Sequence, residues 1–548
     1  MLPMPSTMMD RPLLIKEILW RAEKLYAYRQ VVTQREAGEP RRSTYGGVAV
    51  RARKLASALE RAGVRPGDRV ATFGWNTQTH LECYFAIPCM GAVLHTINVR
   101  LFHDQLEYII NHAEDQVVFC DRSVLPVFEQ LAGKIPSVRL VVLMNEGPGP
   151  STDAFQTVDY EEFLGAGSES FDWPDLDERS AAGMCYTSGT TGNPKGVVYS
   201  HRSTFLHSLV AGLPNSTGVG EHDAVMYAVP MFHANAWGLP YTCALAGAAQ
   251  VLSDRFLDPQ RVVNLLDSEG VTISAGVPTI WIGVLNLLET SGRRLPKLRR
   301  VLCGGSAAPP ALIDGLRRNG IELVHAWGMT ETSPLGSLTR IPSVLLDAPE
   351  AEQNKYRYKQ GQIVPTIECR IVDVESGREL PWDGVAFGEL QVRGPYITGS
   401  YYHDPQSAEK FSADGWLRTG DVATIDQYGF IQLVDRTKDL VKSGGEWISS
   451  VELENLIMAH PKVLEAAVVG LPHPKWDERP VAAVVLKPDQ MLTADEVRAF
   501  LSDKVAKWWL PDEVLFVESL PKTSVGKFAK NHLREQLAEV ARRWAAVG

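Results

Sequence analysis

The sequence predicts an α/β protein with a largely parallel sheet and a second, smaller domain. Helical and strand-like patterns alternate through the first two-thirds of the chain, which is typical of parallel sheets covered by helices. The chain has 548 residues, and one domain usually has ~100 to 200. A charged segment with two adjacent glycines, at 435–450, precedes the last part of the chain. We therefore expect at least two domains.

Hydrophobic periodicity predicts the first elements of the large domain. Residues 51–63 predict an amphipathic helix that ends at a glycine C-cap, Gly63. The apolar face of this helix is formed by Leu55, Ala58, Leu59 and Ala62. Strand-like apolar runs follow at 70–75, 116–120 and 139–144. Helical segments lie between these runs, which favours parallel pairing.

The glycines of the 435–450 segment predict a hinge between the two domains. We expect a large domain over 1–435 and a small α+β domain over 436–548, with the hinge at about 435–440. Ser449 and Glu452 form a capping-box pattern for a helix in the small domain. Apolar runs at 463–471 and 479–487 then predict two strands.

Composition excludes several classes of function. The 55 Lys and Arg against 65 Asp and Glu give a net charge of −10, so we expect no general attraction to nucleic acid or to an anionic membrane. Seven cysteines without a CxxC pair argue against a zinc site and a disulfide framework and favour a cytoplasmic setting. The N-terminus lacks the pattern of a secretory signal. The longest uncharged stretch, 224–253, is interrupted by prolines and polar residues, so we interpret it as the buried wall of a ligand pocket rather than a membrane span.

The strongest local signal is the segment YTSGTTGNPKGV at 186–197. Its glycines let backbone N–H groups converge on an anion, its hydroxyls add donors, and Lys195 supplies a positive charge for the outer phosphates. The spacing differs from the GxxxxGK[ST] loop of P-loop kinases and GTPases. A flexible surface turn is the plain alternative, but twelve consecutive residues of this composition favour a phosphate-binding loop.

This loop resembles the signature of the adenylate-forming superfamily, which includes acyl-CoA synthetases, peptide-synthetase adenylation domains and firefly-type luciferases. Further motifs that resemble the family's are MFHANAWGLPY (231–241), GGSAAP (304–309), HAWGMTE (325–331), RTGD (418–421), DRTKDLVKSGGEWIS (435–449) and PKTSVGK (521–527). They follow the family's order and cover nearly the whole chain. The resemblance implies a large N-terminal domain with sandwiched, mostly parallel sheets and a distorted β-barrel, followed by a small mobile C-terminal domain.

The resemblance also implies a reaction with ATP, Mg²⁺ and coenzyme A. A carboxylate attacks the α-phosphorus of ATP to give acyl-AMP and pyrophosphate, and a thiol then displaces AMP. Lys527 takes the position of the lysine that bridges the carboxylate and the phosphate, and His233 that of the residue that guides the carboxylate. The implied oxygen ligands of Mg²⁺ are Thr187 and Glu331. The implied catalytic residues are thus Lys527, Glu331, Thr187 and His233.

The residues implied in nucleotide and CoA binding come from all the motifs. Asp421 would accept hydrogen bonds from the ribose hydroxyls, with Arg436 assisting, and Lys438 would be the pivot of the small domain. After the first half-reaction, Ser443, Gly444 and Gly445 would swing to the thiol tunnel. The remaining residues of this set are Thr187, Ser188, Gly189, Thr190, Thr191, Gly192, Lys195, Ala234, Trp237, Gly305, Ser306, Ala307, His325, Ala326, Trp327, Gly328, Met329, Thr330, Lys442 and Trp447.

The predicted acid pocket uses the uncharged stretch. Trp237 matches the gate tryptophan of long-chain fatty acyl-CoA synthetases, and Trp447 would be its partner across the hinge. The pocket set is His233, Trp237, Val277, Pro278 and Gly304, with Trp281 and the residues up to Ala307 beside it. Because no acidic residue lies between Asp223 and Asp254 to pair an α-ammonium group, an apolar acid is favoured over an amino acid. Ala234, where close relatives often have valine, and Cys303 leave the exact acid open.

These patterns favour an AMP-forming fatty acid-CoA ligase for medium to long chains. Three alternatives stay open: a ligase for 3-methylmercaptopropionate, an acyl-AMP ligase with a carrier-protein acceptor, and a non-catalytic nucleotide sensor. The retention of Lys527, Glu331 and the whole phosphate loop argues against the sensor. The segment PSTMMD at 5–10 resembles the start of synthetases that dimerise through swapped N-terminal segments, so we expect a homodimer.

Overall fold

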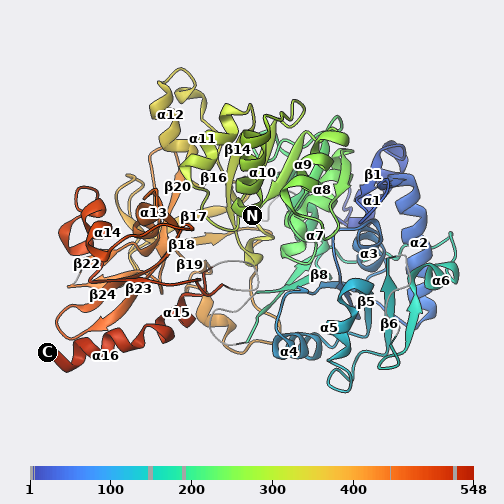
Figure 1. The fold of residues 1–548 in the computed structure, drawn as a ribbon. Helices are drawn as coiled ribbons and strands as arrows, with labels where there is room; N and C mark the ends of the chain where they lie inside the picture. Colours follow the sequence, from blue (N-terminus) through green and yellow to red (C-terminus); the bar gives the residue numbers. More distant parts are fainter. Residues whose placement is uncertain are drawn as a thin grey trace.

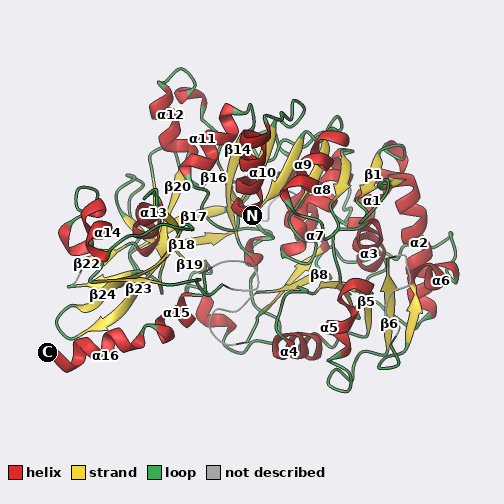
Figure 2. Cartoon of the chain, viewed as in Figure 1, coloured by secondary structure: helices red, strands yellow, loops and turns green. Residues whose placement is uncertain are grey.

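The computed structural model describes residues 4, 6–145, 152–187, 193–444, 446–522 and 528–547. Figures 1 and 2 show a large body of helices and sheets, and a smaller lobe beside it that ends at the C-terminus. We call the part up to Arg436 the large body and the part from Val441 the small lobe. The last strand of the large body ends at Arg436, and the first strand of the small lobe begins at Val441.

The large body contains two sheets. A seven-stranded sheet has the order β7-β6-β5-β3-β4-β8-β9 and is parallel except for the β8–β9 pair. Its strands are β3 (Arg69–Phe73), β4 (Val93–Thr96), β5 (Val117–Asp121), β6 (Leu140–Met144), β7 (Thr157–Asp159), β8 (Ala181–Tyr186) and β9 (Gly196–Ser200). The largely parallel sheet expected from the alternating pattern is confirmed.

A thirteen-stranded sheet has the order β17-β18-β19-β20-β16-β15-β14-β13-β12-β10-β11-β1-β2. Its strands pair in parallel from β14 through β1 and antiparallel from β17 to β14. The antiparallel part is the part of the sheet that corresponds to the distorted β-barrel implied by the family resemblance. The strands are β1 (Gln30–Thr33), β2 (Arg41–Thr44), β10 (Ala224–Tyr227), β11 (Ala249–Leu252), β12 (Ile273–Gly276), β13 (Arg300–Cys303), β14 (Glu322–Gly328), β15 (Leu335–Leu338), β16 (Gly361–Ile363), β17 (Glu368–Val372), β18 (Phe387–Arg393), β19 (Leu417–Ile425) and β20 (Phe430–Arg436).

Helices cover the faces of both sheets. They are α1 (Ile15–Leu25), α2 (Tyr45–Arg61), α3 (Gln78–Cys89), α4 (His103–Ala113), α5 (Leu125–Glu129), α6 (Tyr160–Gly165), α7 (His201–Gly212), α8 (Leu239–Ala246), α9 (Pro259–Ser268), α10 (Pro278–Ser291), α11 (Pro310–Arg318) and α12 (Glu350–Arg357). No helix in the described ranges is long and apolar enough to cross a membrane.

Helix α3 lies between the two sheets, because it packs against β4 and β8 of one and β1 of the other. All twelve of its residues are buried, so it has no polar face and no amphipathic period. Its buried carboxylate, Glu82, is balanced by Arg51 Nε at 2.7 Å and by the Tyr160 hydroxyl at 2.6 Å. This charge pair is needed because an unpaired buried carboxylate is costly.

The small lobe is an α+β unit. Strands β21 (Val441–Ser443), β22 (Glu446–Ile448), β23 (Val463–His473) and β24 (Asp477–Leu486) pair antiparallel in the order β22-β21-β24-β23, and β25 (Glu513–Phe516) joins β24 in parallel. Its helices are α13 (Ser450–Met458), α14 (Ala494–Leu501), α15 (Lys530–Gln536) and α16 (Ala538–Val547). The Ser449 hydroxyl accepts the N–H of Glu452, so the predicted N-cap of α13 is confirmed.

The other predicted elements agree with the structure within a few residues. The helix expected over 51–63 is α2, which begins earlier, at Tyr45, because the Thr44 side chain caps it by accepting the Gly47 N–H. Gly63 follows its end with a φ of 87°, a conformation that glycine adopts without strain. The uncharged stretch forms β10, α8 and β11 and is mostly buried. All seven cysteines are free thiols, and six are buried.

A backbone bridge joins the two sheets at Asp254, whose N–H donates to the Asn76 carbonyl at 2.9 Å. Burial, together with the nearby charge of Asp121, raises the pKa of Asp254 to about 7. Between the ordinary pKa near 4 and this value, the folded state holds a proton that the unfolded state releases. The free energy of unfolding should therefore fall as the pH rises through this window.

Asp254→Asn is expected to remove this penalty and to stabilise the protein by about 1 to 2 kcal/mol at pH 8, because the full shift corresponds to at most about 4 kcal/mol. Asparagine also tolerates the left-handed backbone, with φ 53°, at this position. Urea melts at pH 5 and pH 8 measure the effect. A gain equal at both pH values would assign the stabilisation to the backbone and contradict the raised pKa.

Candidate active site

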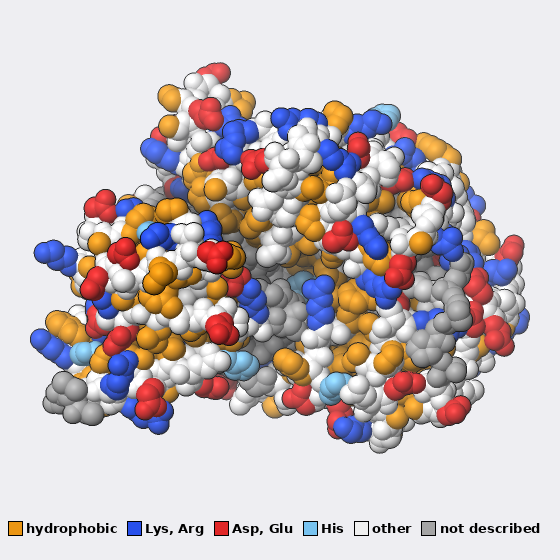
Figure 3. Space-filling view, viewed as in Figure 1, with side chains coloured by type: hydrophobic (Ala, Val, Ile, Leu, Met, Phe, Trp, Pro, Cys, Tyr) orange, Lys and Arg blue, Asp and Glu red, His pale blue; other side chains and the backbone are white. Residues whose placement is uncertain are grey.

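The predicted site residues gather at the carboxyl ends of neighbouring parallel strands. Strands β10, β12, β13 and β14 lie side by side, and the segments that follow them contain His233, Val277, Gly304 and Met329 in that order. In open α/β sheets, ligands bind at this edge. Figure 3 shows the surface hollowed between the large body and the small lobe, with hydrophobic side chains and Lys and Arg side chains on its walls.

The phosphate loop connects β8 to β9. The Thr187 N–H donates to the Lys195 carbonyl at 2.9 Å, and the Lys195 N–H reaches the Thr187 hydroxyl at 3.3 Å, so the two ends of the loop are tied together. The predicted residues Ser188, Gly189, Thr190, Thr191 and Gly192 lie outside the described residues.

Lys195 already has an anionic partner. Its Nζ lies 2.6 Å from Asp404 Oδ2 and 5.1 Å from the centre of the Tyr401 ring. The hydrogen bond from Lys195 lowers the pKa of Asp404. An arriving phosphate would therefore compete with, or share, the charge of this lysine.

Tyr401 links this lysine to Glu331. The Tyr401 hydroxyl donates to Glu331 Oε1 at 2.6 Å, and Glu331 is only 6% exposed. Burial raises the pKa of Glu331. The segment that contains Glu331 is held in place by two further hydrogen bonds, both of 2.8 Å. The Thr398 N–H donates to the Glu331 carbonyl, and the Tyr199 hydroxyl donates to the Thr330 carbonyl.

Glu331 is suited to a hard cation. Among the described residues, the hydrogen bond that the buried carboxylate accepts comes from a neutral hydroxyl, although the positive charge of Arg436 also acts on Glu331 and lowers its pKa against the effect of burial. A divalent cation would stabilise the charged form of this carboxylate further. Mg²⁺ takes one or two protein oxygens together with waters and phosphate oxygens. Within the described ranges, no group of three or more His, Cys, Asp or Glu side chains is placed to hold a metal by itself. The donor set of Glu331 and Thr187 therefore fits Mg²⁺ that is shared with a phosphate.

A second carboxylate anchors the other end of the site. Asp421 on β19 faces Arg436 on β20 in the strand register, and Arg436 Nε lies 2.8 Å from Asp421 Oδ1. The Trp327 indole N–H donates to Asp421 Oδ2, also at 2.8 Å. The negative charge of Asp421 is the main cause that raises the pKa of Arg436. Asp421 is thus a fixed, buried hydrogen-bond acceptor next to β14.

The strand with His325 and Ala326 contacts the loop at 304–308. The Ala308 N–H donates to His325 Nε2 at 3.2 Å, and burial lowers the pKa of His325 to about 4, so the ring is neutral. A side chain at Gly304 would lie 3.1 Å from the Ala326 carbonyl and 3.2 Å from the Trp237 ring. Gly304 therefore lets the predicted nucleotide strand and the predicted acid gate meet. Gly305, Ser306 and Ala307 continue this loop before α11.

The predicted gate is a strained left-handed turn. Residues 234–238 all have positive φ, from 39° at Ala234 to 71° at Gly238, and Trp237 is at 56°. Each non-glycine residue in this conformation costs roughly 1 to 2 kcal/mol. The turn is held by Asn235 Oδ1, which accepts from the Thr96 and Cys185 side chains, and by the Thr242 hydroxyl, which donates to the Gly238 carbonyl at 3.0 Å.

His207 packs on the end of this turn. A Cβ at Gly238 would lie 2.5 Å from the His207 ring, and His207 Nε2 accepts the Leu335 N–H at 3.3 Å. The ring therefore contacts both the gate turn and β15, which follows the Glu331 loop. Trp281, expected beside the pocket, is fully buried in the core with α9 and α11, and its indole N–H donates to the Gly276 carbonyl. Val277 and Pro278 lie at the start of α10.

The described small-lobe residues of the predicted site have partners other than Trp237 in this orientation. Trp447 lies under Lys442, whose Nζ is 5.3 Å from the Trp447 ring and 2.7 Å from Glu375 Oε1 of the large body. Figure 1 shows β22, which carries Trp447, at the outer edge of the small lobe, away from α8. Ser443 accepts from Arg479 at 2.8 Å, and Gly444 packs against Trp476. Gly445 and Lys527 lie outside the described residues.

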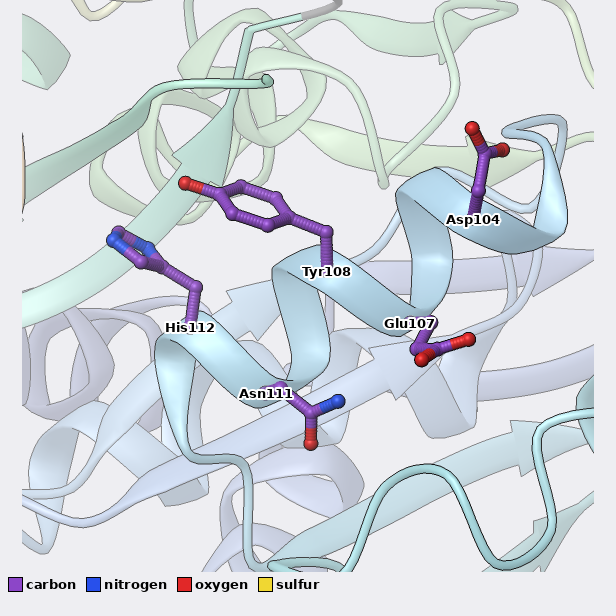
Figure 4. Close-up of a pocket in the computed structure, with 5 residues that line it drawn as sticks. All are labelled: Asp104, Glu107, Tyr108, Asn111 and His112. Atoms are coloured by element: carbon purple, nitrogen blue, oxygen red, sulfur yellow. The ribbon is translucent and has the colours of Figure 1, made fainter.

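Helix α4 contacts Tyr186, the residue that precedes the start of the phosphate loop at Thr187. Figure 4 shows Tyr108 and His112 on one side of this helix, in a shallow pocket that Asp104, Glu107 and Asn111 complete. His112 Nδ1 lies 2.7 Å from the hydroxyl of Tyr186, the residue before Thr187. The adjacent His95 is paired with Asp115 at 2.8 Å, and both are fully buried. We therefore read this pocket as support for the loop rather than as a separate site.

Sequence reasoning missed several residues that the structure places at the site. Tyr401 and Asp404 come from the segment SYYHD at 400–404, and His207 from α7. The adjacent aromatic residues before a histidine and an aspartate were a visible pattern, but nothing in the sequence linked them to Glu331 and Lys195.

Comparisons with known proteins identify the family. The AMP-binding enzyme family matches residues 19–402, and the AMP-binding enzyme C-terminal domain matches residues 452–527. The long-chain-fatty-acid–CoA ligase of Thermus thermophilus is 48% identical over 97% of each chain. The 3-methylmercaptopropionyl-CoA ligase of Ruegeria pomeroyi and the medium-chain-fatty-acid–CoA ligase of Ectopseudomonas oleovorans are 46% and 45% identical, each over 98% of this chain and 99% of the relative.

Two solved structures share the fold over nearly the whole chain. The anthranilate CoA ligase AuaEII in complex with anthranoyl-AMP has a TM-score of 0.85 at 26% identity and covers 97% of this chain and 99% of its own. ATP-bound MatB from Rhodopseudomonas palustris has a TM-score of 0.81 at 26% identity and covers 96% and 99%.

Proposed function

Because the chain belongs to the AMP-binding enzyme family, we propose that it is an ATP-dependent fatty acid-CoA ligase that forms AMP. The observation that carries this proposal is the cluster at the carboxyl edge of the sheets, where Lys195, Glu331 and Asp421 lie beside an uncharged wall. Three curated relatives that are 45 to 48% identical are ligases that attach a carboxylic acid to coenzyme A.

In the first half-reaction, a carboxylate oxygen forms a bond to the α-phosphorus of ATP while the bond to pyrophosphate breaks. Both reactants are anions, so the chain must supply positive charge and oriented donors. We assign this role to Lys195 and the phosphate loop on the pyrophosphate side, and to Lys527 at the attacking carboxylate. Asp421 and Arg436 would hold the ribose, and the neutral His325 would lie beside the base.

In the second half-reaction, the thiol sulfur of coenzyme A bonds to the acyl carbon, the bond to AMP breaks, and the thiol proton is released. We propose that the small lobe turns about the segment 436–440 between the two steps. The turn would bring Ser443, Gly444 and Trp447 of the β21–β22 hairpin to the acid side of the site. Magnesium, when bound to Glu331 and Thr187, would supply charge neutralisation for the phosphates.

For the acid, we propose a medium to long alkyl chain, because the wall at 224–253 lacks charged residues and because the relatives that are ligases for long-chain and medium-chain fatty acids are 48% and 45% identical. A ligase for 3-methylmercaptopropionate is the second candidate, since two relatives with that activity are 46% and 44% identical. An acyl-AMP ligase with a carrier-protein acceptor is the third. A homodimer and a cytoplasmic location complete the proposal.

The test is product formation with ATP, Mg²⁺ and coenzyme A across acids from acetate to palmitate, with 3-methylmercaptopropionate included. We expect AMP and acyl-CoA in equal amounts, the highest rate on a medium or long chain, and loss of both products in Lys527→Ala. The highest rate on 3-methylmercaptopropionate would select the second candidate. Pyrophosphate release without any thioester would overturn the assignment of coenzyme A as the acceptor.

A further inference from the structure

A buried charged network joins the large body to the small lobe outside the proposed substrate contacts. Lys530, the first residue of α15, places its Nζ 2.7 Å from Glu454 Oε1 and 2.6 Å from the Ser450 hydroxyl oxygen. The Ser450 hydroxyl and the Ser450 N–H both donate to Asp435 Oδ2, each at 2.6 Å. The bonds thus run from β20 through the start of α13 to α15.

The charged and polar members of this network are buried, so water cannot replace their contacts with one another. Asp435 is 5% exposed, Glu454 is 6% exposed and Ser450 is fully buried. Each carboxylate also accepts a backbone N–H, from Arg436 at 2.7 Å and from Val468 at 2.8 Å. A buried network is stabilising only while every member is satisfied. Removing the single cation, Lys530, would leave two buried carboxylates without a neutralising partner.

The network spans the proposed hinge. Asp435 is the last residue but one of β20, while Ser450 and Glu454 belong to α13 of the small lobe. A third bond, from the Ser449 hydroxyl to the Val434 carbonyl at 2.6 Å, runs parallel to the Ser450 bonds. A rotation of the small lobe about 436–440 would separate these pairs. The network therefore exists in one orientation of the lobe and not in a rotated one.

We propose that Lys530 is a positioning residue that holds the small lobe, through Ser450 and Asp435, in the orientation for the first half-reaction. The proposal rests on the proposed function. In this orientation, the hairpin with Trp447 lies away from α8, whereas α15 lies at the junction with the large body (Figure 1).

A contact made in only one of two orientations shifts their populations by its own free energy. Loss of Lys530 should therefore slow the first half-reaction and spare or speed the second. A merely structural lysine would slow both together. The two half-reactions can be measured apart, by acid-dependent exchange of pyrophosphate into ATP and by thioester formation from supplied acyl-adenylate.

Lys530→Met keeps the aliphatic stem and removes the charge. We expect the exchange rate to fall about tenfold, the size of one lost charge-assisted hydrogen bond, with little change in the KM for ATP. Thioester formation from acyl-adenylate should be unchanged or faster. Lys530→Arg, which keeps the charge, should restore exchange to within about threefold. Lys504→Met, which removes an exposed lysine paired with Asp503, is the matched control and should change neither rate.

Ser450→Ala gives a milder version of the same change, because it removes the bridging hydroxyl and keeps the N–H bond to Asp435. Limited trypsin cleavage after Lys438 and Lys442 reports the orientation of the small lobe without any substrate. This cleavage should be faster in Lys530→Met than in the wild type. Unchanged cleavage in Lys530→Met, or an equal fall in the rates of both half-reactions, would overturn the proposed positioning role of Lys530. Absence of acid-dependent pyrophosphate exchange in the wild-type chain would instead overturn the proposed function. Faster cleavage of Lys530→Met would even then support the positioning role of Lys530.

Discussion

Asp421→Ala is expected to lower the rate of acyl-adenylate formation by about 10²- to 10³-fold. Asp421 accepts from both Trp327 and Arg436 and is only 4% exposed. Its removal would take away the proposed partner of two ribose hydroxyls and leave Arg436 without its 2.8 Å anion. Charge-assisted hydrogen bonds are worth about 1.5 to 3 kcal/mol each, so two of them account for this loss.

Asparagine should not rescue the site. Asp421 faces one N–H donor at each oxygen, so an amide would have to turn its own NH₂ group toward one of them. We therefore expect Asp421→Asn to lose nearly as much activity as alanine, with the KM for ATP raised in both variants. Pyrophosphate exchange at several ATP concentrations separates the effect on KM from the effect on kcat.

Asp426→Ala is the matched control for this prediction. Asp426 is 7% exposed and pairs with Lys359 in the turn that joins β19 to β20, so its loss also removes a buried carboxylate with a basic partner. It should lower the melting temperature and leave exchange nearly intact in folded protein. If Asp421→Ala retained more than a third of the wild-type exchange rate, the proposed ribose contact would be wrong.

The sequence was informative wherever chemistry is concentrated in a short segment. The strands at 117–121 and 140–144 and the N-cap Ser449 agree with their patterns because each depends on local propensity or capping. The predicted site segments after β10, β12, β13 and β14 could be found as motifs, and the parallel strand order is what places them side by side.

Features that depend on long-range packing left no such pattern. Helix α3 is buried on every side, so it lacks the polar stripe that reveals a surface helix. The left-handed turn at 234–238 contains two alanines, an asparagine, a tryptophan and a glycine, of which only the asparagine and the glycine are suited to that conformation. Its bonds to Thr96 and Cys185 come from strands β4 and β8, far away in the chain.

The strained turn has a consequence for the proposed gate. Its conformation persists only because Asn235, Gly238 and the neighbouring strand residues over-determine it. Trp237 lies at its end and touches Gly304, next to the strand with His325 and Ala326. A shift in that strand on nucleotide binding would therefore reach the tryptophan directly. The glycines of this region act less as flexible points than as places where two backbones meet.

Gly328→Ala is the second change with a large expected effect. Gly328 ends β14, and a Cβ there would lie 1.7 Å from the Pro334 carbonyl oxygen and 3.2 Å from the Gly336 nitrogen. These are backbone atoms, so no side-chain rotation relieves the clash. The same carbonyl accepts the Met329 N–H at 3.1 Å and closes the loop that contains Glu331. We expect unfolding to become easier by about 2 to 4 kcal/mol.

The loss of activity should exceed what unfolding explains, because a shift of the loop by about 1 Å moves Glu331 away from its Tyr401 partner, and such misplacement costs about 10²-fold in rate. Urea melts and pyrophosphate exchange at saturating ATP measure the two effects in one preparation. Gly165→Ala, where a Cβ meets nothing within 4 Å, is the control and should match the wild type in both. Exchange at the wild-type rate in folded Gly328→Ala would show that adenylation does not depend on this loop conformation, and with it the assigned role of Glu331 would fall.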